Sequence, residues 1–150
     1  MKIISDSGSS TAKRAAAMLE ARNEGFVVPT GRQRQNLLVA FAKKGKVVYG
    51  KAFDIVRLNA PVDLDDLDDV ENSLVNILVF EIKSTRKVLP PDFSGYFFGL
   101  SAAEMLVAQS LRDHFKFIFV NITTGTHVEM GIGDIFARAK GIYPTWSIMF

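Results

Sequence analysis

Hydrophobic residues recur along this chain at two spacings, which predict helices in some stretches and strands in others. Small and aliphatic residues repeat at helical spacing over residues 10–23, after a Ser-Ser-Thr run whose hydroxyls can cap a helix. The tripeptide at 23–25 ends in glycine and stops that pattern, and the apolar residues 26–28 lead into a Pro-Thr-Gly turn. The sequence therefore predicts a helix over 10–23 followed by a short extended segment.

Residues 37–58 allow two interpretations. Leu37, Leu38 and Phe41 can line one face of a helix that ends at Gly45. The hairpin interpretation is favoured, because Lys43-Lys44-Gly45-Lys46 has the composition of a turn and strong strand formers follow it as far as residue 56. We therefore expect two strands joined by a turn at 43–46.

The second half of the chain predicts a buried strand and a capped helix. An acidic run over 63–69 is expected to form a loop or a short helical turn, and the mostly apolar stretch 75–83 then has the pattern of a central strand. Ser101 and Glu104 form a capping box that starts a helix reaching about residue 115. The remaining expected elements are a strand over 116–121, a turn at Thr124-Gly125, a strand ending near Met130, a helix over 133–140 and an extended segment through Trp146.

The order of the main elements is helix, strand, strand, strand, helix, strand. This order predicts an α/β fold with a mixed central β-sheet flanked by helices, built on an α-β-β-β-α-β core. A chain of 150 residues suits one hydrophobic core, so residues 1–150 are expected to form a single domain.

The amino-acid composition limits the cellular compartment and the kinds of site that this chain suits. The chain has no cysteine, which excludes disulfides and thiolate metal sites and favours a reducing compartment. Its first residues do not resemble a signal peptide, and its apolar runs are far shorter than the ~20 residues of a membrane span. A cytoplasmic protein without a membrane partner is expected.

Charge is distributed unevenly, although the net charge is only +2. Residues 1–60 hold eleven Lys and Arg against four acids, whereas residues 61–81 hold seven acids and no base. A basic first part favours a polyanionic partner such as nucleic acid, and an ordinary solvated surface is the alternative.

Three charged residues lie within strongly apolar strand patterns. Asp54 lies in the first pattern, and Glu81 and Lys83 lie at the end of the next. Residues two apart in a strand project from the same face, so Glu81 and Lys83 are expected side by side with Ile82 pointing the opposite way. Asp54 can converge on that face from the neighbouring strand. The alternative is a structural ion pair between Glu81 and Lys83, with Asp54 in a solvated turn.

A divalent cation removes the cost of burying two carboxylates together. Asp54, Glu81 and the backbone carbonyl of Ile82 offer the hard oxygen ligands that Mg²⁺ or Mn²⁺ prefers. The Lys83 amine can lie beside a water on that cation and stabilise negative charge as a phosphate is attacked. The pattern therefore favours phosphodiester hydrolysis.

Phe53-Asp54-Ile55-Val56 followed by Val79-Phe80-Glu81-Ile82-Lys83 resembles the strand pair of the PD-(D/E)xK nucleases, in particular the Holliday-junction resolvases. The resemblance covers roughly residues 10–122 and implies a restriction-endonuclease-like fold and a Mg²⁺-dependent DNA endonuclease, often a homodimer. It also implies that Asp54 and Glu81 hold the metal, that Lys83 assists the water, and that Glu20 supports the site from the first helix. One departure is Phe53, which stands where the family motif often has proline.

Two polar segments are candidates for contacting DNA. Their side chains are suited to contact phosphates and base edges. The alternative for each segment is an ordinary polar loop. The candidates are Arg32, Arg34 and Gln35 in the first segment and Ser84, Thr85, Arg86 and Lys87 in the second.

Aromatic residues near the second segment are expected in the core rather than stacked on bases. They are Tyr96, Phe97, Phe98, Phe115, Phe117 and Phe119. The alternatives to a nuclease are an inactive nucleic-acid-binding module of the same fold, a protein-interaction module, and a nucleotide hydrolase, for which a Gly-rich phosphate loop is lacking.

Overall fold

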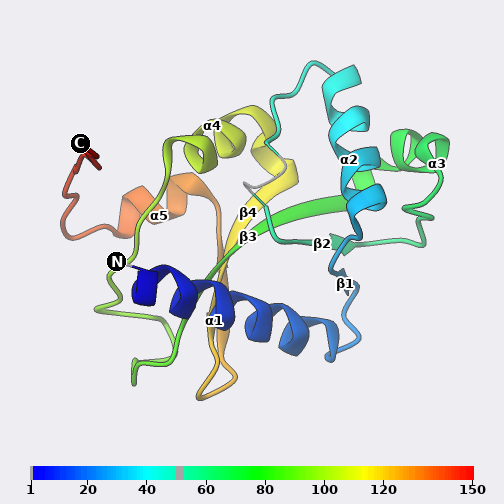
Figure 1. Cartoon of the computed structure of the whole chain (residues 1–150). Helices are drawn as coiled ribbons and strands as arrows, with labels where there is room; N and C mark the ends of the chain where they lie inside the picture. Colours follow the sequence, from blue (N-terminus) through cyan, green and yellow to red (C-terminus); the bar gives the residue numbers. More distant parts are fainter. Residues whose placement is uncertain (1, 50–52) are drawn as a thin grey trace.

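The computed structural model describes residues 2–49 and 53–150, with side chains from residue 10 onward. The chain alternates between helices and strands, with two 3₁₀ turns that each lead directly into a strand (Figure 1). The elements are α1 (Lys2–Glu20), β1 (Phe26–Val27), α2 (Gly31–Lys43), β2 (Ile55–Leu58), α3 (Leu67–Asn72), η1 (Leu74–Asn76), β3 (Ile77–Thr85), α4 (Ala102–Leu111), η2 (Arg112–His114), β4 (Phe115–Asn121), β5 (His127–Met130) and α5 (Ile132–Arg138).

The five strands form one mixed sheet in the order β1-β2-β3-β4-β5. β1, β2 and β3 pair antiparallel, β3 and β4 pair parallel, and β5 returns antiparallel to β4. The parallel pair is connected through α4, as parallel strands require a crossover. The expected α/β architecture with a mixed sheet between helices is therefore confirmed.

The alternation of side chains along β3 and β4 builds a core on each face of the sheet. On one face α1 packs through Ala15, Ala16 and Leu19 against residues that include Phe80 and Ile118. On the other face α2, α3, α4 and α5 cover a larger core (Figure 1), whose strand residues include Val56, Ile77, Val79, Phe115, Phe117 and Phe119. Both faces of the central strands are buried, which explains why their sequences are almost continuously apolar.

The hairpin expected at 37–58 is wrong, because the first half of that stretch is helix α2. Thr30 caps the helix by accepting from the backbone N–H of Gln33, whose side chain in turn accepts from the Thr30 N–H. Leu37, Ala40 and Phe41 are buried at helical spacing. Gly45, expected in a hairpin turn, lies just beyond the helix with φ of +73°, a position where helices commonly end on glycine. Residues 46–49 form no strand.

The other expected elements are present with shifted ends. The first helix begins at Lys2 rather than near residue 10 and ends at Glu20, and the helix capped by Ser101 ends at Leu111 rather than near 115. Asp66 caps α3 within the acidic run. The turn before β1 depends on Gly25, since its φ is +93° and a Cβ there would lie 2.5 Å from the carbonyl oxygen of Leu58.

Several aromatic and apolar residues differ from the expected burial. Phe115, Phe117 and Phe119 are buried, and Tyr96 and Phe98 pack against that core. Phe97 is 77% exposed, so its expected place in the core is wrong. Residues 139–150 have no regular structure, and the apolar side chains of Trp146, Ile148 and others near them are exposed. Within residues 2–49 and 53–150, no helix combines the length and apolar character needed to cross a membrane.

Candidate active site

Asp54 lies immediately before β2, where its main chain and side chain both bond to β3. Its backbone N–H donates to the carbonyl of Phe80 at 2.8 Å, and its Oδ2 accepts from the backbone N–H of Ile82 at 2.8 Å. The carboxylate thus takes the place that a backbone carbonyl would hold in a longer β2. Asp54 does not lie within the strand, as the sequence suggested, but β3 fixes its position.

Glu81 and Lys83 project from the same face of β3, as expected. They continue the row of Ile77 and Val79 toward the layer of α2 and α4, whereas Ile82 packs on the opposite face under α1. Their side chains are 14% and 15% exposed, and Lys83 Nζ lies 3.9 Å from Glu81 Oε1. A carboxyl and an amine are therefore held together at the end of an apolar row, with limited access to water.

Glu104, in the first turn of α4, completes the charge cluster. Its Oε2 lies 2.6 Å from Lys83 Nζ, and its Oε1 accepts from the backbone N–H of Ser101 at 2.9 Å. Burial opposes its ionisation, but Lys83 and the donors of Ser101 outweigh burial and lower the pKa of Glu104. The sequence identified Glu104 only as a capping residue, because its approach to Lys83 depends on how α4 packs against β4, the neighbour of β3.

Glu81 has the most perturbed acidity in the cluster. Burial, followed by the neighbouring carboxylates of Asp54 and Glu104, raises the pKa of Glu81 to about 9, against a smaller opposing effect of Lys83. Its Oε2 is buried, and a hydrogen bond between the Glu81 and Asp54 carboxyls adds to the rise. At neutral pH the Glu81 carboxyl is therefore protonated and can donate to the Asp54 carboxylate.

Arg34 belongs to the same cluster rather than to an exposed loop. It donates from Nη1 to the carbonyl of Phe53 at 2.7 Å, and its guanidinium lies 4.3 Å from the centre of the Phe53 ring. Burial lowers the pKa of Arg34, and the nearby Asp54 and Glu81 partly offset that effect. Phe53 therefore provides the surface on which this guanidinium rests.

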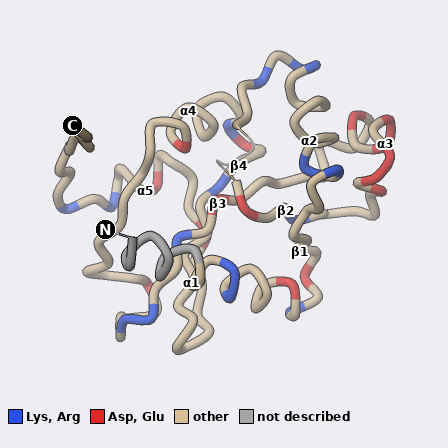
Figure 2. Tube along the Cα trace, in the orientation of Figure 1, with Lys and Arg blue, Asp and Glu red and all other residues tan. Residues whose placement is uncertain are grey.

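The other candidate DNA-contacting residues fall into two groups. Arg32 and Gln35 are exposed on the first turns of α2, and Arg86 and Lys87 are exposed just beyond β3. In contrast, Ser84 donates to Thr11 of α1 at 2.9 Å, and buried Thr85 accepts from the backbone N–H of Lys87. The acidic residues of 63–71 gather on α3 and the loop before it, close to the basic start of α2 (Figure 2).

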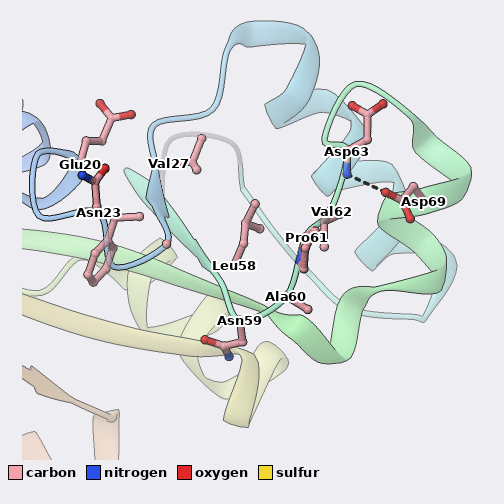
Figure 3. Close-up of a pocket in the computed structure, with 12 residues that line it drawn as sticks. Glu20, Asn23, Val27, Leu58, Asn59, Ala60, Pro61, Val62, Asp63 and Asp69 are labelled. Carbon is pink, nitrogen blue, oxygen red and sulfur yellow. Dashed lines mark hydrogen bonds between the residues drawn. The ribbon is translucent and has the colours of Figure 1, made fainter.

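The structure places Glu20 away from this cluster. Glu20 ends α1, on the opposite face of the sheet from Glu81 and Lys83, and its Oε2 accepts from the backbone N–H of Val28 at 3.2 Å. It lines an open groove of about 870 Å³ beside Leu58, together with Asp63 and Asp69 (Figure 3). There the Asp63 N–H donates to Asp69 at 2.6 Å. The groove therefore lies at the far end of β2 from Asp54.

The oxygens of the cluster fit a hard divalent cation. Asp54 has one carboxylate oxygen beyond the one bonded to Ile82, and the buried Glu81 carboxyl lies next to the Asp54 carboxylate. The Ile82 carbonyl leaves the strand on the same side as its N–H, toward Asp54, because both main-chain groups of a strand residue point to the same neighbour. Among the residues described, no group of three or more His, Asp or Glu stands ready to enclose a metal.

Comparison of this chain with protein-family models, with curated proteins and with solved structures gives no match.

Proposed function

We propose that this protein is a Mg²⁺- or Mn²⁺-dependent DNA endonuclease with a restriction-endonuclease-like fold. The observation that carries the proposal is that Asp54, Glu81 and Lys83 lie together: Lys83 Nζ is 3.9 Å from Glu81 Oε1, and burial, followed by the nearby carboxylate of Asp54, raises the pKa of Glu81 to about 9. The order α1, β1, β2, β3, α4, β4 supports the fold, since it is the order that the resemblance implies. α2 and α3 are additions to that core.

Each residue has a defined role in this proposal. Asp54, Glu81 and the carbonyl of Ile82 hold the cation, and Ile82 also fixes Asp54 through its N–H. When bound, the cation supplies Lewis-acid activation of water and of the scissile phosphate. The Lys83 ammonium stabilises the negative charge that develops on the phosphate. Arg86 and Lys87, exposed at the end of β3, bind the flanking phosphates.

The protonated state of Glu81 sets a condition on metal binding. The Glu81 carboxyl would have to lose its proton to hold a cation, so metal binding at neutral pH would release close to one proton and would become tighter as pH rises. The proton therefore competes directly with the metal for this ligand.

A second function, a nucleic-acid-binding or protein-interaction module of the same fold without turnover, is favoured by one observation. Lys83 is already paired with Glu104 at 2.6 Å, and the three ionic side chains are only 11–15% exposed. A cluster neutralised within the protein in this way also serves as a buried structural network.

Cleavage of DNA by the purified protein distinguishes the two functions. Supercoiled plasmid and labelled duplex, single-stranded and four-way-junction oligonucleotides are incubated with Mg²⁺ or Mn²⁺. We expect cleavage that stops in EDTA and falls by about 100-fold or more in Lys83→Ala, while Lys140→Ala cuts like the wild type. Binding without cleavage of any form in either metal would instead establish the module.

Dimer formation is a separate part of the proposal. The resemblance implies a homodimer, so that two sites cut the two strands, and light scattering on the purified protein reports its mass in solution. A monomeric mass with and without DNA removes the dimer and leaves the proposed chemistry of each site intact.

A further inference from the structure

The contact between α4 and β3 links the capping of a helix to the placement of the Lys83 amine. The two carboxylate oxygens of Glu104 make different contacts, since Oε1 accepts from the Ser101 N–H at 2.9 Å and Oε2 pairs with Lys83 Nζ at 2.6 Å. A carboxylate can make both contacts because it has two acceptor oxygens in a fixed geometry. The orientation that caps α4 is therefore the orientation that meets Lys83.

We propose that Glu104 is a positioning residue of the nuclease site, which holds the Lys83 ammonium at a fixed place beside Glu81 through its capping contact with α4. This inference rests on the proposed function. A lysine has four rotatable side-chain bonds, so its ammonium loses considerable conformational freedom when it is held in one place. The short contact with Glu104 provides that ordering before DNA arrives.

The distances show which carboxylate fixes the amine. Glu81 Oε1 lies 3.9 Å from Lys83 Nζ, beyond hydrogen-bond range, whereas Glu104 Oε2 lies at 2.6 Å. Glu104 is also buried, with its backbone in the first turn of a helix that packs on β4. Its place is set by the fold, so it can act as a fixed support while Glu81 remains available to a cation.

Two substitutions separate positioning from capping. Glu104→Gln keeps the size of the side chain but is uncharged and has one acceptor oxygen instead of two, so it can accept from the Ser101 N–H but cannot also form the ion pair with Lys83. Ser101→Ala is the matched control, since it removes only the Ser101 hydroxyl, which accepts from the Glu104 N–H, and keeps the Ser101 N–H contact and the Lys83 ion pair of the Glu104 carboxylate. Thermal unfolding of both variants establishes that each is folded under the assay conditions.

The first measurement reports the Lys83 contact without any activity. A buried ammonium in a short ion pair exchanges its protons slowly and gives a ¹H–¹⁵N side-chain NMR signal, which is assigned by its loss in Lys83→Arg. We expect this signal in the wild type and in Ser101→Ala, and its loss in Glu104→Gln. Retention of the signal in Glu104→Gln would overturn the inference.

The second measurement is the steady-state kinetics of DNA cleavage. Glu104→Gln is expected to lower kcat by about 10- to 100-fold with KM within about 3-fold of the wild type, while Ser101→Ala changes neither. An unchanged kcat in Glu104→Gln overturns the inference even if the NMR signal is lost, because the contact would then be structural only. If the wild type cuts no DNA, the proposed function fails, and the NMR signal still decides whether Glu104 holds Lys83.

Discussion

The carboxylate of Asp54 and the backbone N–H of Ile82 are joined by a hydrogen bond of 2.8 Å, so an acidic side chain takes a main-chain position in the sheet. Asp54 thereby contributes both to the pairing of the sheet and to the electrostatics of the site. Its Oδ2 completes the pairing of β3, and its charge faces Glu81.

Two substitutions of Asp54 distinguish these two contributions. Asp54→Asn keeps an acceptor for the Ile82 N–H and removes the charge, so we expect stability within about 1 kcal/mol of the wild type and loss of Mn²⁺ binding by about 10-fold or more. Asp54→Ala leaves the N–H without its partner and is expected to cost about 1–3 kcal/mol. Urea unfolding and calorimetric Mn²⁺ titration measure the two effects. Equal destabilisation in both variants would contradict this assignment.

The raised pKa of Glu81 predicts that the stability of the protein depends on pH. This pKa is raised by burial from 4.5 to about 9, so between these values the folded protein binds more protons than the unfolded chain. The free energy of unfolding therefore falls as pH rises through this range. Glu81→Gln removes this titrating carboxyl. We expect the free energy of unfolding of the variant to exceed that of the wild type by about 1–3 kcal/mol at pH 8 and by less at pH 5. Urea unfolding at the two pH values tests this, and a pH-independent difference would count against a protonated Glu81.

Thr30 provides a test of helix α2. Thr30→Ala removes the side-chain acceptor for the Gln33 N–H and is expected to lower the free energy of unfolding by about 1 kcal/mol. Thr30→Ser keeps the acceptor and should lie within a few tenths of a kcal/mol of the wild type. The two values come from urea unfolding under identical conditions. Indistinguishable stabilities would argue against the cap.

Arg57 and Glu129 connect β2 to β5 across the α1 face of the sheet. Nη1 and Nη2 of the guanidinium lie 2.5 Å and 3.2 Å from the two carboxylate oxygens, and the same group lies over the Phe26 and Phe80 rings. Glu129→Gln is expected to cost about 1 kcal/mol, because a bidentate charged pair becomes a weaker one. The cost should shrink in 1 M NaCl, which thermal unfolding in low and high salt measures.

Arg86 and Lys87 test the direction from which DNA approaches. If each contacts one phosphate, replacing both with alanine is expected to weaken DNA binding by a similar factor for all sequences. It should also reduce the slope of log K against log salt concentration by about 2. Lys43→Ala is the control, because Lys43 is paired with Glu71 at 2.7 Å on the α2–α3 side. Fluorescence anisotropy across a salt series measures the slopes, and equal slopes would place the DNA elsewhere.

Sequence patterns identified the parts of this structure that depend on local spacing. β3 and the shared face of Glu81 and Lys83 follow from alternation along a single strand, and the start of α4 follows from its capping box. Helix α2 was missed because the Lys-Lys-Gly sequence that ends a helix is also suited to a hairpin turn, and only burial of Leu37 and Phe41 against the sheet decides between them.

The rest of the site depends on contacts between elements far apart in the chain. Glu104 reaches Lys83 only because α4 packs against β4 beside β3, and the Arg34 guanidinium feels the charge of Asp54 only because α2 sets its side chain on Phe53. No regular spacing in the sequence indicates either of these contacts. For Glu20 the sequence was misleading, because its position on the first helix matched the resemblance but α1 lies on the other face of the sheet.

The two outer strands of the sheet are short, with two residues in β1 and four in β5. Growth of a sheet from one molecule to the next requires a long row of main-chain donors and acceptors without partners. Strands of this length offer only a small template for such growth. Stacking of copies into fibrils through the sheet margins is therefore disfavoured, which protects a chain whose central strands are among its most apolar segments.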